Sequence, residues 1–283
     1  MAKGTARAAG CLMVALLLLA LAGIAGFLYL RQKGLADPVP GQQRCVGRSG
    51  DASVAVDLEQ AHYASIVVGI SVARGLPARA ASIAMATVYQ ETGIRNLDYG
   101  DRDSVGLFQQ RPSQGWGTEQ QLMDPYYATN RFYDALVKIK DWQTADINDV
   151  AQQVQVSGHP EAYRQHETSA RVLASTLSGH SPGGFSCLER RHNPGNADGL
   201  TGSLKDTFGR IPVQRTGRTI TINASTDQLA WAYAHFAVAN TRYFGVVTVT
   251  VGDRHWEVDG FSMPSWAGAT PAAKQRTVVI TVR

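Results

Sequence analysis

A single carboxylate at the end of an apolar stretch is the residue of this sequence best placed to do chemistry. Glu91 closes the run Tyr89-Gln90-Glu91, and the polar segment 106–110, opened by Gly106, begins fifteen positions later. A carboxylic acid that is held neutral can protonate the bridging oxygen of a glycosidic bond. The pattern therefore favours acid catalysis on a sugar.

The segment before Glu91 is predicted to be a helix that begins near Pro77. At helical spacing Ile83, Thr87 and Glu91 lie on one line, so Glu91 is expected to emerge at the edge of a core. Partial burial and the negative end of the helix dipole both favour the protonated carboxyl. The alternative at this point is an ordinary glutamate, solvated at a helix end.

Two further carboxylates, Asp101 and Asp103, lie in the loop between Glu91 and Gly106. If one of them holds a water at roughly 6.5–9.5 Å from the Glu91 carboxyl, the reaction is an inverting hydrolysis. If neither does, a group of the substrate can trap the oxocarbenium-like centre, which gives an anhydro sugar. A third possibility is that both aspartates bind a cation or brace the loop by pairing with nearby arginines (Arg95, Arg102, Arg111).

Hydrophobic periodicity predicts the helices that position these residues. Apolar residues recur at helical spacing in five segments, which begin near Asp57, Leu76, Asp124, Asp146 and Pro160. Five helices with short connections predict a mainly α domain over residues 54–180.

The chain after residue 180 is predicted to form a linker and a second domain. Residues 181–216 are rich in Gly, Pro, Ser, Asn and Arg, which predicts a linker. Residues 217–283 combine one aromatic-rich helix with three strand patterns, two of them separated by Gly252-Asp253, which predicts a small α+β domain. The sequence shows no metal-ligand spacing or phosphate loop, so no metal and no cofactor is predicted.

The N-terminus contains an apolar run of twenty residues, from Cys11 to Leu30. A helix of that length can cross the hydrocarbon core of a bilayer. We expect residues 1–35 to form a cytoplasmic tip and transmembrane anchor, residues 36–53 a stalk, and the remainder to lie on the extracytoplasmic side of the cell membrane. A cleaved signal peptide is the alternative.

The cysteines and the net charge bear on the expectation that most of the chain lies outside the cytoplasm. Cys45 and Cys187 lie in the exported part and are predicted to form a disulfide, the alternative being two separate thiols. A net charge of +4 suits a protein that works near anionic wall polymers and is too small to indicate nucleic-acid binding.

The motif around Glu91 resembles a known family. Glu91-Thr92 followed by Gly106-Leu107-Phe108-Gln109 resembles the Glu-Ser and Gly-Leu-Met-Gln motifs of the soluble lytic transglycosylase and goose-type lysozyme superfamily, with the same offset. The resemblance implies a lysozyme-like fold over residues 54–180. It implies that Glu91 acts as general acid and then base on the β-1,4 bond between N-acetylmuramic acid and N-acetylglucosamine, and that Gln109 lines the saccharide cleft.

The sequence also departs from the family. Thr92 replaces the usual Ser, and the later Ala-Tyr-Asn-Ala-Gly motif falls near residues 154–158, where the Tyr and Asn are missing. Tyr163 is expected to replace part of that function. Trp116, between two glycines, is a candidate platform for a sugar ring or, alternatively, an aromatic plug. The predicted substrate-binding residues are Gln109, Ser104, Tyr163, Trp116 and Gln110.

Two functions are therefore expected. The first is a membrane-anchored peptidoglycan lytic enzyme that binds glycan strands, with an envelope protein as a further partner of the C-terminal domain. The second is a non-catalytic peptidoglycan-binding or envelope-assembly protein that keeps the lysozyme-like fold.

Overall fold

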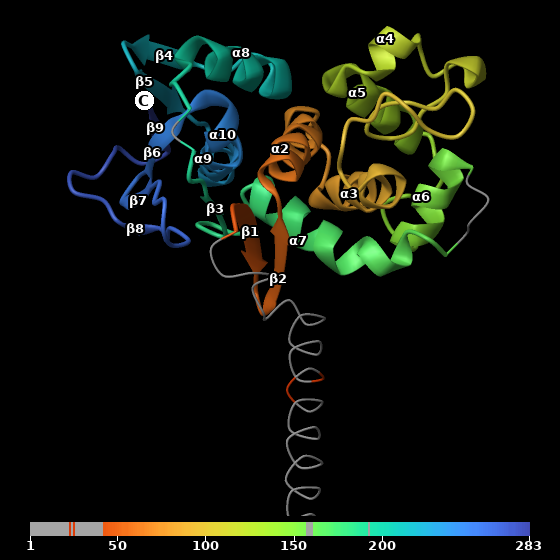
Figure 1. The fold of residues 1–283 in the computed structure, drawn as a ribbon, viewed down its shortest axis with the longest axis horizontal. Coiled ribbons are helices and arrows are strands. Elements are labelled where there is room, and N and C mark those ends of the chain that lie inside the picture. The colour runs from red at the N-terminus through yellow and green to blue at the C-terminus, as the bar shows by residue number, and fades with distance from the viewer. Residues whose placement is uncertain (1–22, 24, 26–41, 157–160, 192) are drawn as a thin grey trace, which may run out of the picture. The chain divides into compact units, whose positions relative to one another are not determined.

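A computed structural model describes residues 23, 25, 42–156, 161–191 and 193–283. The chain divides into two units, residues 1–40 and 41–283, and nearly all of the described residues belong to the second (Figure 1). The predicted membrane anchor and its cytoplasmic tip lie outside the described residues apart from Gly23 and Ala25. No helix within the described ranges is long and apolar enough to cross a membrane.

The second unit contains both helices and strands. The helices are α2 (Leu58–Ala73), α3 (Ala78–Thr92), α4 (Glu119–Leu122), α5 (Pro125–Leu136), α6 (Ile147–Gln155), α7 (Glu167–Leu177), α8 (Ala197–Phe208), α9 (Asp227–Ala239) and α10 (Thr241–Phe244), with 3₁₀ turns η1 (Pro112–Gln114) and η2 (Arg164–His166). The strands are β1 (Arg44–Ser49), β2 (Ala52–Val56), β3 (Phe185–Leu188), β4 (Val213–Thr216), β5 (Thr219–Asn223), β6 (Val246–Val251), β7 (Arg254–Glu257), β8 (Ala267–Gly268) and β9 (Thr277–Val282).

The strands form two antiparallel sheets, one in the order β2-β1-β3 and one in the order β4-β5-β9-β6-β7-β8. The prediction of a mainly α domain followed by a small α+β domain is therefore wrong, because the described fold is mixed α and β with two antiparallel sheets. In the first sheet β1 pairs with its neighbour β2 across the Gly50-Asp51 turn and with β3 about 140 residues away, at Cys45↔Cys187, and the polar composition of residues 36–53 concealed both pairings. Strand formation depends on such pairing more than on local composition.

Segments expected to be irregular contribute to these sheets and to the core. Residues 44–53, expected in the stalk, lie largely in β1 and β2. Residues 181–216, expected as a linker, contain β3 and α8, and α8 contacts α2 and β5. Composition alone did not indicate these contacts.

Helix α2 is the centre of the second unit. It contacts α3 and α5 on one side and α8 and α9 on the other, and Figure 1 shows it between these two groups. Ten of its residues are buried, and buried residues of the helical part and the six-stranded sheet belong to one hydrophobic cluster. Asn240, which caps α9, donates to the Ser65 hydroxyl of α2 at 3.0 Å. The predicted helical and α+β regions thus share one core.

A buried histidine in this core gives a testable pH dependence. His235 of α9 is fully buried, and burial lowers its pKa to about 4 although its Nδ1 lies 2.7 Å from the Thr176 carbonyl. As the pH falls, the unfolded chain therefore takes up this proton first. The contribution of neutral His235 to stability is complete above pH 6.5, its unfolded pKa, and is lost between 6.5 and about 4, by about 3 kcal/mol.

Urea unfolding measured from pH 7.5 to 4 should therefore show stability falling with pH. His235→Asn keeps a donor for Thr176 and should flatten this slope, whereas the exposed-site control His180→Asn should not. Burial also lowers the pKa of His62 and His166, so a smaller slope should remain in His235→Asn. An unchanged slope in His235→Asn would contradict the assignment.

Candidate active site

Glu91 lies one residue before the end of α3 and is half-buried. The helix ends at the cap residue Gly93, whose left-handed backbone conformation ends the helix. The Tyr163 hydroxyl donates to Glu91 Oε1 at 2.8 Å, and Gln155 Nε2 donates to the same oxygen at 3.3 Å. Two side chains that are 64 and 72 positions away in the sequence therefore meet Glu91 at one carboxylate oxygen.

Two hydrogen bonds, from Thr92 and Gln155, hold the Gly106–Gln110 segment close to Glu91. The Thr92 hydroxyl lies 3.0 Å from the Leu107 carbonyl, and Gln155 Nε2 donates to the Phe108 carbonyl at 2.7 Å. The side chains of Leu107 and Phe108 point into the core, and Phe108 stacks on Phe132 at 4.6 Å between ring centroids. The segment thus presents its backbone, and not its apolar side chains, to Glu91.

Gly106 has a left-handed backbone conformation, which residues with a side chain adopt only at a cost in free energy. Its φ is 79°, and a Cβ added there would lie 2.3 Å from the Leu122 carbonyl oxygen. Gly106→Ala should therefore lower the free energy of unfolding by at least about 2 kcal/mol, from left-handed backbone strain plus this clash.

Gly75→Ala is the matched control for Gly106→Ala. Gly75 has a φ of 65°, but nothing lies within 4 Å of its added Cβ, so the control measures backbone strain alone. Urea unfolding of both variants should show the larger loss for Gly106→Ala. Equal losses would mean that the Leu122 contact is unimportant.

Gln109 and Ser104, both predicted to bind substrate, contact each other. The Ser104 hydroxyl lies 2.9 Å from Gln109 Oε1, and Gln109 Nε2 donates to the Tyr99 carbonyl at 3.2 Å. Ser104 is buried and Gln109 is half-buried with a φ of 48°. These contacts hold the loop 98–104 against the Gly106–Gln110 segment.

Asp103 is engaged in bracing this loop. It accepts hydrogen bonds from the backbone N–H of Ser113 at 2.8 Å, from Arg111 Nε at 2.7 Å and from the Ser113 hydroxyl at 3.0 Å. The Ser113 N–H, followed by the Arg111 guanidinium, holds the pKa of Asp103 well below its usual range. These contacts match the bracing alternative, in which Arg111 is the partner.

Asp101 is solvent-exposed and lies 3.9 Å from Arg102 Nε. Arg95, also considered as a loop partner, instead pairs with Asp57 and Glu59 at the start of α2.

Three of the predicted substrate-binding residues face the protein interior, and one of them, Tyr163, is fully buried. Gln110 is buried and donates from Nε2 to the Ala128 carbonyl at 3.3 Å. Trp116 is partly buried and packs against the hydrophobic core, while its carbonyl accepts from Arg131 Nε at 3.1 Å. The structure therefore brings Tyr163, but neither Gln110 nor Trp116, into contact with Glu91.

Gln155 is the functional candidate that the sequence prediction missed. It stands where the resembling family has the Tyr of Ala-Tyr-Asn-Ala-Gly, and it contacts both Glu91 and the Phe108 carbonyl. Carrying that motif position over to this sequence would have identified it. Residues 157–160, between Gln155 and Tyr163, lie outside the described ranges.

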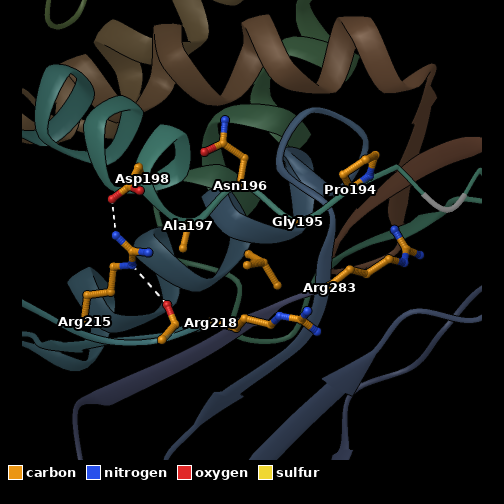
Figure 2. Close-up of a pocket in the computed structure, with 10 residues that line it drawn as sticks. Pro194, Gly195, Asn196, Ala197, Asp198, Arg215, Arg218 and Arg283 are labelled. Atoms are coloured by element: carbon orange, nitrogen blue, oxygen red, sulfur yellow. Dashed lines mark hydrogen bonds and ion pairs between the residues drawn. The ribbon is translucent and has the colours of Figure 1, made fainter.

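The largest cavity characterised on the described unit lies elsewhere. Its volume is about 410 Å³, and Figure 2 shows Arg215 beside Asp198 within it. Arg215 Nε also donates to the Gly217 carbonyl at 3.0 Å. Arg283, at the same cavity, pairs with the buried Glu189. Two of its arginines are thus already neutralised, which makes it a poor candidate for an active site.

Among the residues that the structure describes, no group of three His, Cys, Asp or Glu side chains is placed to hold a metal ion. Comparison of this sequence with protein-family models and with curated proteins gives no match.

Proposed function

We propose that this protein is a peptidoglycan lytic enzyme that cleaves the β-1,4 bond between N-acetylmuramic acid and N-acetylglucosamine. The observation that carries the proposal is the half-buried Glu91 carboxyl, held by Tyr163 and Gln155 beside the Gly106–Gln110 segment. This arrangement supports acid catalysis by one carboxyl group that is held in place next to a polar loop. The motif resemblance supports the choice of substrate.

The hydrogen bonds to Glu91 suggest which oxygen carries the proton. Tyr163 and Gln155 both donate to Oε1, so in the neutral acid Oε1 is the accepting oxygen and Oε2 carries the hydrogen. Glu91 would donate this proton to the glycosidic oxygen as the bond breaks. The resulting carboxylate would then accept a proton from the attacking water or sugar hydroxyl.

The proposed site of action is outside the cytoplasm. The predicted disulfide between Cys45 and Cys187 is confirmed, and both sulfur-bearing residues are buried. Structural disulfides form and persist in oxidising compartments. This supports access to the cell wall.

Digestion of purified peptidoglycan by the full chain, with the products resolved by mass spectrometry, tests the proposal. Anhydro-muropeptides would indicate a lytic transglycosylase and reducing ends a hydrolase. Absence of any released muropeptide, from a preparation shown to be folded by circular dichroism, would contradict an enzymatic function.

Tyr163→Phe tests the positioning of Glu91. Loss of a hydrogen bond to a carboxylate is expected to reduce the rate of muropeptide release about 10- to 100-fold, because Glu91 is then held by Gln155 alone among the described residues. Tyr243→Phe removes the same hydroxyl from an exposed side chain outside the candidate site and should leave the rate unchanged. Equal rates for the two variants would show that the Tyr163 contact is unimportant for catalysis.

A peptidoglycan-binding or envelope-assembly role is the second candidate. It is favoured by the missing Tyr and Asn of the family motif and by the position of Glu91 outside the three characterised cavities. Co-sedimentation with insoluble peptidoglycan in the absence of any muropeptide release would support this role over the enzyme.

A further inference from the structure

A second cavity lies where the two sheets meet, away from Glu91. Its volume is about 340 Å³, and it is lined by β1, by the turn before β3 and by the segment between β7 and β8. Ligand sites in proteins usually have volumes of about 300–1,000 Å³. The cavity is therefore large enough for a small ligand.

The charges around this cavity are of one sign. Arg48 and Arg254 line it, and its lining residues include no aspartate or glutamate. Neither arginine forms an ion pair within the described part of the chain, although Arg254 donates to the Trp266 carbonyl at 2.7 Å. The other two characterised cavities differ, since one contains Asp198 and the other contains Asp227 and Asp253.

Another part of the lining, formed by Met263, Pro264 and Trp266, is apolar and is held to β3 by hydrogen bonds. The Trp266 indole N–H donates to the Phe185 carbonyl at 2.9 Å, so this polar atom is satisfied within the protein. The Ser186 hydroxyl donates to the Pro264 carbonyl at 2.7 Å and accepts from Trp256 Nε1 at 2.9 Å. These bonds fix the 264–266 segment to β3, and the wall is thus formed before any ligand binds.

We infer that this cavity is a binding site for an oxyanion, carboxylate or phosphate, carried by a small molecule or segment with an apolar body. Guanidinium groups bind both anions through paired N–H donors, and two arginines without acidic partners supply that chemistry here. The apolar wall formed by Trp266, Met263 and Pro264 would contact the body of the ligand. The inference does not depend on the function proposed for Glu91.

Tryptophan fluorescence of the full chain provides the test, because Trp266 lines the cavity. The probes are N-acetylalanine, its uncharged amide N-acetylalaninamide, and inorganic phosphate, each compared with sodium chloride at equal ionic strength. A saturable change with N-acetylalanine or phosphate, but not with the amide, is expected. If only N-acetylalanine gives a saturable change, the ligand's charged group is a carboxylate. If only phosphate does, that group is a phosphate.

Arg48→Gln and Arg254→Gln should each weaken that binding about tenfold or more, since each removes charge-assisted hydrogen bonds. Arg210→Gln removes an exposed arginine outside the cavity and should have no effect. Circular dichroism checks that each variant is folded, and either cavity variant alone can decide the outcome. The inference fails if neither anion saturates, if the amide binds equally well, or if the folded cavity variants bind like the wild type.

Discussion

Glu91→Gln should reduce muropeptide release by a factor of about 10³ or more, without loss of fold. General acid catalysis typically contributes 10²- to 10⁴-fold to a rate, and an amide cannot donate a proton to the leaving oxygen as a carboxylic acid does. The amide oxygen can still accept hydrogen bonds from Tyr163 and Gln155, so the contacts of the site should survive. The measurement is the initial rate of release from purified peptidoglycan.

Glu167→Gln is the matched control for this substitution. It removes a carboxylate from the start of α7, where Glu167 pairs with Arg171 in an exposed i,i+4 contact. Such contacts contribute only a few tenths of a kcal/mol, so activity and stability should both remain near wild type. If Glu91→Gln were as active as Glu167→Gln, Glu91 would not be the catalytic acid.

Removal of the Cys45–Cys187 disulfide should cost roughly 3–5 kcal/mol of stability. The two residues face each other across β1 and β3, are fully buried, and are separated by 142 positions. A cross-link that closes so long a loop lowers the entropy of the unfolded chain by an amount equivalent to about 5 kcal/mol in the chain-entropy model. Double substitution Cys45→Ala and Cys187→Ala should therefore shift the urea midpoint strongly downward.

A reducing agent provides the internal control for this experiment. It should destabilise the wild type towards the level of the double variant and leave the double variant itself unchanged. Cleavage of the bond without any change in the urea midpoint would show that the sheet formed by β1, β2 and β3 is stable without its cross-link.

Several local features could be predicted from the sequence. The capping box of Asp57 and Gln60, the Gly93 cap behind Glu91 and the β6–β7 hairpin around Gly252-Asp253 are all present. Each depends on residues within a few positions of one another, where backbone conformation and short hydrogen bonds decide the outcome. The pairing of Cys45 with Cys187 was predictable for another reason, because only two cysteines follow the apolar run.

The tertiary structure alone decided the fold class and the partners of Glu91. Periodicity indicated helices but not the first sheet, in which β1 pairs with its neighbour β2 and also with β3, about 140 residues away. Likewise Gln155 and Tyr163 are 64 and 72 positions from Glu91, and only the packing of their segments against α3 brings them to its carboxylate. The sequence by itself predicted Glu91 as the candidate acid and the helix near whose end it lies. The hydrogen-bond partners that hold that residue follow from long-range packing, which no local pattern encodes.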